Sequence, residues 1–80
     1  MDARAYLNEI AQDYVSITCN KKIVGGMPAI KGTRIQVSLI LACLRDKMSI
    51  EEICEDYHLS SDNIKKAMEY AIAVLDRPFL

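Results

Sequence analysis

The 80-residue chain contains no tryptophan, one phenylalanine and one histidine. It has no Cys-x-x-Cys pair, and Cys19, Cys43 and Cys54 are not spaced with His58 as zinc ligands are. No apolar stretch approaches the roughly 20 residues that a membrane helix requires. We therefore expect neither a metal site nor a membrane span.

Enzyme motifs are also missing. The sequence has no phosphate-binding loop of P-loop spacing, and no nucleophile has a base nearby in the chain. We therefore predict no catalytic residue and no cofactor. The chain shows no signal peptide after Met1, and an odd number of unpaired cysteines suits a reducing compartment, so we expect a cytoplasmic protein.

The size of the chain limits its core. Eighty residues form one domain, and a chain of this length buries only about 60% of the surface that it exposes when unfolded. Small domains of this kind usually need a disulfide, a metal or a partner subunit. Since the first two are not indicated, we predict a homodimer.

All three glycines lie in one stretch, GGMPAIKGTRIQV, residues 25–37. Lys31-Gly32 predicts a tight turn, because glycine adopts positive φ without cost. The alternation over Thr33–Val37 predicts a strand with one apolar face, and Val15–Cys19 predicts a second strand. Residues 15–36 should therefore form a small β element, whose unpaired edge at Ile30–Val37 favours pairing with a second copy.

Helical patterns occupy the two ends of the chain. Residues 1–14 predict an N-terminal helix capped by Asp2. Residues 37–77 predict three helices, with a capping box at Ser49 and Glu52, a second cap at Ser60, and an end before Pro78. The positions expected to face inward are Val37, Ile40, Leu41 and Leu44 in the first of these helices, and Ile64, Ala67, Met68, Ala71 and Leu75 in the last.

The last two helices have the apolar pattern of a helix-turn-helix motif, with inward residues Ile50, Ile53, Cys54, Tyr57, Leu59, Ile64 and Ala67. In such motifs the second helix enters the DNA major groove. His58 stands at the turn position often held by glycine and would need an unusual backbone conformation. The side chains expected to contact DNA are Ser60 and Ser61 at phosphate, Asn63 at adenine, and Lys65 and Lys66 along the backbone. A plain helical hairpin without DNA binding is the alternative.

The distribution of charge gives evidence both for and against DNA binding. The first motif helix is acidic, with Glu51, Glu52, Glu55 and Asp56, and the net charge of the chain is −1, whereas DNA-binding modules are usually basic on one face. The basic residues gather upstream at Lys21, Lys22, Lys31 and Arg34, which are either phosphate contacts or a solvated surface. Arg34 can form a fork to phosphate or carboxylate, or a structural ion pair with Asp46 or Glu55.

The sequence resembles the bacterial and archaeal family called domain of unknown function four-three-three. The resemblance rests on Gly26, Pro28, Ile30, Gly32, Thr33, Arg34, Ile35 and Val37, followed by Ser49, Glu51, Glu52, Ile53, Tyr70 and Ala71. Gln36 and His58 stand where the family usually has proline. The resemblance implies an antitoxin-like helix-turn-helix protein, often encoded beside a PIN-like ribonuclease toxin, and it brings no catalytic residues.

These patterns together predict one mainly α domain. An N-terminal helix and short strands should precede a three-helix bundle of the homeodomain-like or winged-helix-like type. We expect an antitoxin and autoregulator of a toxin-antitoxin operon that binds double-stranded DNA at its own promoter. The alternative is a module that neutralises a PIN-like nuclease without binding DNA, since an acidic helix could meet a basic nuclease surface.

Overall fold

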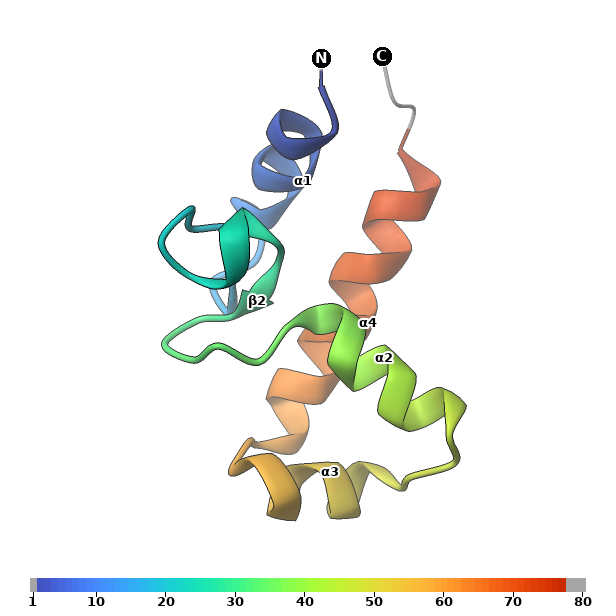
Figure 1. The fold of residues 1–80 in the computed structure, drawn as a ribbon. Coiled ribbons are helices and arrows are strands. Elements are labelled where there is room, and N and C mark those ends of the chain that lie inside the picture. The colour runs from blue at the N-terminus through green and yellow to red at the C-terminus, as the bar shows by residue number, and fades with distance from the viewer. Residues whose placement is uncertain (1, 78–80) are drawn as a thin grey trace.

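The computed structural model describes residues 2–77 as four α-helices, a short 3-10 turn and a two-stranded antiparallel sheet (Figure 1). The elements in chain order are α1 (Ala3–Ala11), β1 (Ile17–Thr18), η1 (Val24–Gly26), β2 (Ala29–Ile30), α2 (Val37–Arg45), α3 (Ile50–Tyr57) and α4 (Ser61–Asp76). The predicted mainly helical fold with a small β element after an N-terminal helix is confirmed.

The helix starts follow the predicted caps. The Asp2 carboxylate accepts from the backbone N–H of Ala5 at 2.8 Å, which fixes the start of α1. Ser49 and Ser60 each begin a helix within a complete capping box. The ends are less well predicted, since α1 stops at Ala11 rather than at residue 14. α4 ends at Asp76, before the proline as expected.

The β element is smaller than predicted. β1 pairs with β2 so that Ile17 lies opposite Ile30. Gly32 adopts φ +81° in a turn closed by a 3.0 Å hydrogen bond from the N–H of Thr33 to the carbonyl of Ile30, which confirms the predicted turn. The strand predicted over Thr33–Val37 is wrong, since this segment makes only one isolated bridge, between Gln36 and Ala29.

Thr33 explains why that strand does not form. Its hydroxyl donates to the carbonyl of Ile30 at 2.8 Å and accepts from the N–H of Ile35 at 3.0 Å. Both bonds hold the chain in the turn, and α2 begins at Val37 before a strand could extend. On the other side of β2, Lys31 N–H donates to the carbonyl of Ser16. The expected open strand edge is therefore closed within the chain on both sides.

The core lies where α4 packs against α1, α2 and α3. Its most deeply buried side chains are Tyr70, Ile10, Ile30, Ile40, Ile53 and Ile64. The predicted inward positions are wrong at Leu41, Met68 and Leu75, which are exposed. On α4 the helix α1 packs against the side that carries Tyr70, whose hydroxyl donates to the Leu7 carbonyl at 2.8 Å.

Candidate nucleic-acid interface

The turn between α3 and α4 has the length found in helix-turn-helix motifs, with His58, Leu59 and Ser60 between the two helices. His58 is in the left-handed conformation, with φ 57° and ψ 47°, as its position in the sequence required. The N–H of Leu59 then donates to the carbonyl of Cys54 at 3.1 Å, which closes the end of α3. This compact turn leads directly into the start of α4.

The inward pattern of the motif is confirmed with one exception. Ile53, Ile64 and Ala67 are buried, and Cys54, Tyr57 and Leu59 are partly buried against them. Ile50, predicted to face inward, is 41% exposed because it lies in the first turn of α3, beside the solvent-facing side of α4. The two helices therefore share a small apolar contact centred on Ile53 and Ile64.

Two of the predicted DNA contacts form the N-terminal cap of α4. The Ser60 hydroxyl accepts from the N–H of Asn63, and the Asn63 side-chain oxygen accepts from the N–H of Ser60, both at 3.1 Å. Asparagine reads adenine through both its oxygen and its amide group. The oxygen of Asn63 is already in use, so the structure gives this residue a structural role that the sequence analysis did not foresee.

The remaining predicted residues of α4 differ in their availability. Ser61 and Lys65 are exposed on the first two turns of the helix, as is Asp62. Lys66 pairs with Glu69 at 3.4 Å and is less exposed. No ion pair of Lys65 occurs within residues 2–77, so among the α4 cations it is the one available to a phosphate.

Lys31 and Arg34 lie in the exposed turn after β2. The predicted ion pair of Arg34 with Asp46 or Glu55 does not form in the described part of the chain, and Asp46 instead pairs with Arg45 at 3.0 Å. In Figure 1 the loop after β2 and the α3–α4 turn both project on the left of the molecule. Lys21 lies elsewhere, beside Arg4 and the N-terminus of α1.

The acidic side chains of α3 are exposed on the same motif. Glu52 is held by the capping box, where hydrogen bonds from the backbone and then the side chain of Ser49 lower the pKa of its carboxyl. Glu51, Glu55 and Asp56 make no ion pair with any residue between 2 and 77. They give α3 a negative surface that no cation of this region neutralises.

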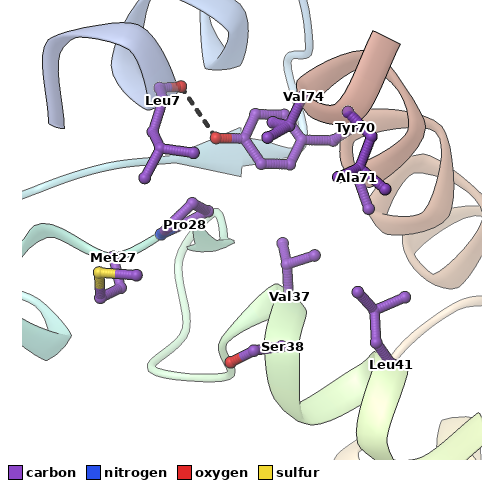
Figure 2. A pocket seen from close by; sticks show the side chains of 10 residues that line it. Leu7, Met27, Pro28, Val37, Ser38, Leu41, Tyr70, Ala71 and Val74 are labelled. Atoms are coloured by element: carbon purple, nitrogen blue, oxygen red, sulfur yellow. Dashed lines mark hydrogen bonds between the residues drawn. The ribbon is translucent and has the colours of Figure 1, made fainter. Parts of the chain in front are cut away.

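An apolar hollow was not anticipated from the sequence. It has a volume of about 280 Å³ and lies between α2 and the C-terminal half of α4, where Val37 and Leu41 face Ala71 and Val74, with Met27 at one side (Figure 2). Its rim includes Leu75, which is 84% exposed. In the sequence, the hollow is indicated only by the apolar residues of α4. Their number exceeds what one buried face of that helix can accommodate.

Fold and surface define a small, mainly helical protein whose last two helices are joined by a three-residue turn. Over residues 17–71, more than half of its length, the chain matches the family described as Protein of unknown function (DUF433), and it belongs to this family. No curated protein and no solved structure matches it.

The helices formed by residues 2–77 are too short or too polar to cross a membrane. Nor does this region bring together three histidine, cysteine, aspartate or glutamate side chains that could hold a metal ion.

Proposed function

We propose that this protein is a small helix-turn-helix DNA-binding protein that acts as an antitoxin and autoregulator of its own operon. The observation that carries the proposal is the α3–α4 unit, in which a left-handed His58 and two capping boxes present the start of α4 to solvent. Ser61 and Lys65 lie on this exposed end, which is the part of the second helix that contacts base edges in such motifs.

The phosphate contacts would come from few cations. Lys31, Arg34 and Lys65 are exposed and make no ion pair within the described residues. Three contacts per protomer give six per dimer, so the logarithm of the binding constant should fall with the logarithm of salt concentration with a slope of about −5. Asp62 and the acidic side chains of α3 would weaken the binding of DNA, because they repel phosphate.

A second candidate function is neutralisation of a PIN-like nuclease without DNA binding. The exposed and unpaired acids Glu51, Glu55 and Asp56 favour it, because a negative helix complements the basic surface that a nuclease presents to nucleic acid. In this case the nuclease would bind α3, and the start of α4 would have no part in the function.

Charge reversals separate the two functions. With Lys65→Glu and Lys66→Glu together, we expect loss of binding to the protein's own promoter, measured by fluorescence anisotropy, while neutralisation of a PIN-like toxin encoded alongside is retained. With Glu51→Lys and Glu55→Lys, we expect the reverse, and tighter DNA binding at low salt. Lys47→Glu, an exposed reversal in the turn after α2, serves as the control.

If the Lys65 and Lys66 reversal leaves promoter affinity unchanged between about 50 and 200 mM salt, where phosphate contacts dominate the dependence, α4 does not contact DNA. The nuclease-binding function would then replace the DNA-binding one.

A further inference from the structure

We propose that the hollow between α2 and the C-terminal half of α4 is the contact surface of a homodimer, in which Leu75 of each protomer occupies the hollow of the other. This inference deepens the proposed function, since it locates the dimer that two DNA half-sites would require. It does not depend on DNA binding itself.

The hollow and the side chain that would fill it belong to one surface. Leu75 lies at the rim and is 84% exposed. Leu41 of α2 and Met27 also line the hollow, and both are exposed. Large apolar side chains grouped around an apolar concavity mark an interaction site. A protruding residue beside a matching hollow is the condition for a two-fold contact, in which residue i meets j and j meets i.

The charges favour a second copy as the occupant. None of the ten side chains that line the hollow is charged at neutral pH. Two identical surfaces can therefore meet there without placing like charges opposite each other. Ser38, the one hydroxyl-bearing side chain of α2 at the rim, already donates to the Gln36 side chain at 3.0 Å.

The other apolar hollow on α4 does not meet this condition. It has a volume of about 490 Å³ and lies beside Ile50, Met68 and Ile72. Three charged side chains, Asp62, Lys65 and Glu69, also line it, so a two-fold contact there would have to bury charged groups. It also adjoins the start of α4, which the proposed function needs for DNA.

The proposed contact leaves both DNA-binding ends accessible. Leu75 follows Ser61 by fourteen helical residues, which corresponds to about 21 Å along α4. Two such helices that meet near Leu75 place their starts up to about 42 Å apart, and a tilt of each helix by about 35° from their common line reduces this to the 34–36 Å between successive major grooves.

Sedimentation equilibrium without DNA tests the dimer. We expect twice the 9.0 kDa chain mass for the natural sequence. Leu75→Glu and Leu41→Glu should give monomers, and Leu75→Ala should raise the dissociation constant roughly 100-fold, since each dimer loses two buried side chains. Val15→Glu is the matched control, because Val15 is 86% exposed and is not among the residues that line the hollow, and it should remain dimeric.

A monomeric natural sequence, or a Leu75→Glu variant that stays dimeric, overturns the proposal. Because Leu75 is exposed in the protomer, Leu75→Ala should keep the helical circular dichroism spectrum of the natural sequence, which separates loss of the dimer from loss of the fold. The two proposals fail separately. A monomer that binds its promoter refutes only this interface, and a dimer that ignores DNA refutes only the DNA-binding function.

Discussion

Replacing His58 with glycine should stabilise the protein. His58 holds φ 57° and ψ 47°, and a non-glycine residue in the left-handed region costs about 1–2 kcal/mol. Its side chain is exposed and makes no hydrogen bond with the rest of residues 2–77, so little is lost on its removal. Glycine adds about 0.4–1 kcal/mol of chain entropy to the unfolded state. The net effect of His58→Gly should be a gain of about 0.5–1 kcal/mol.

Urea unfolding followed by circular dichroism measures this gain as a higher midpoint at unchanged slope. In a domain of this size the thermal midpoint should rise by about 2–8 °C. Glu55→Gly, an exposed change inside α3, should instead cost about 1 kcal/mol, because its backbone is helical. A His58→Gly variant that is less stable than the natural sequence would refute the argument, since it would show that the imidazole supports the turn.

Two further predictions concern helix starts and the core. Ser49→Ala should lower the free energy of unfolding by about 1 kcal/mol in the same urea assay, because the N–H of Glu52 loses its 3.1 Å partner, and an unchanged midpoint would count against the cap. Burial, followed by interaction with Cys19, raises the pKa of Tyr70. Since the unfolded tyrosine ionises near pH 10, the contribution of Tyr70 to stability should be constant below that pH and fall as the pH rises further. Tyr70→Phe should flatten this alkaline decline, and an equally steep decline would show that other groups cause it.

The sequence predicted best where the interactions are local. The caps of Ser49 and Ser60 each depend on a residue three positions later, and the Gly32 turn depends on four consecutive residues. Such contacts can be read from spacing alone. The left-handed conformation of His58 belongs to the same group, because the tight spacing of the two motif helices requires it.

The predictions failed where distant segments decide the outcome. The buried face of α4 includes Tyr70 rather than Leu75 because α1, more than sixty residues earlier, supplies the carbonyl of Leu7. Spacing within α4 cannot reveal this contact. The apolar hollow escaped prediction for the same reason, because α2, α4 and the segment at Met27 form it together.

The cap of α4 also limits how this protein could read DNA. Ser60 and Asn63 satisfy each other, Lys66 is held by Glu69, and Lys65 would contact phosphate, so base contacts would fall to Ser61 and Asp62. Aspartate accepts from the amino group of cytosine, so a contact of Asp62 with a base edge would favour a G·C pair. The same aspartate repels phosphate, so binding to unrelated sequences should be weak. A protein of this kind would need two half-sites at once, and the dimer contact at Leu75 would then contribute as much to recognition as the residues that touch the bases.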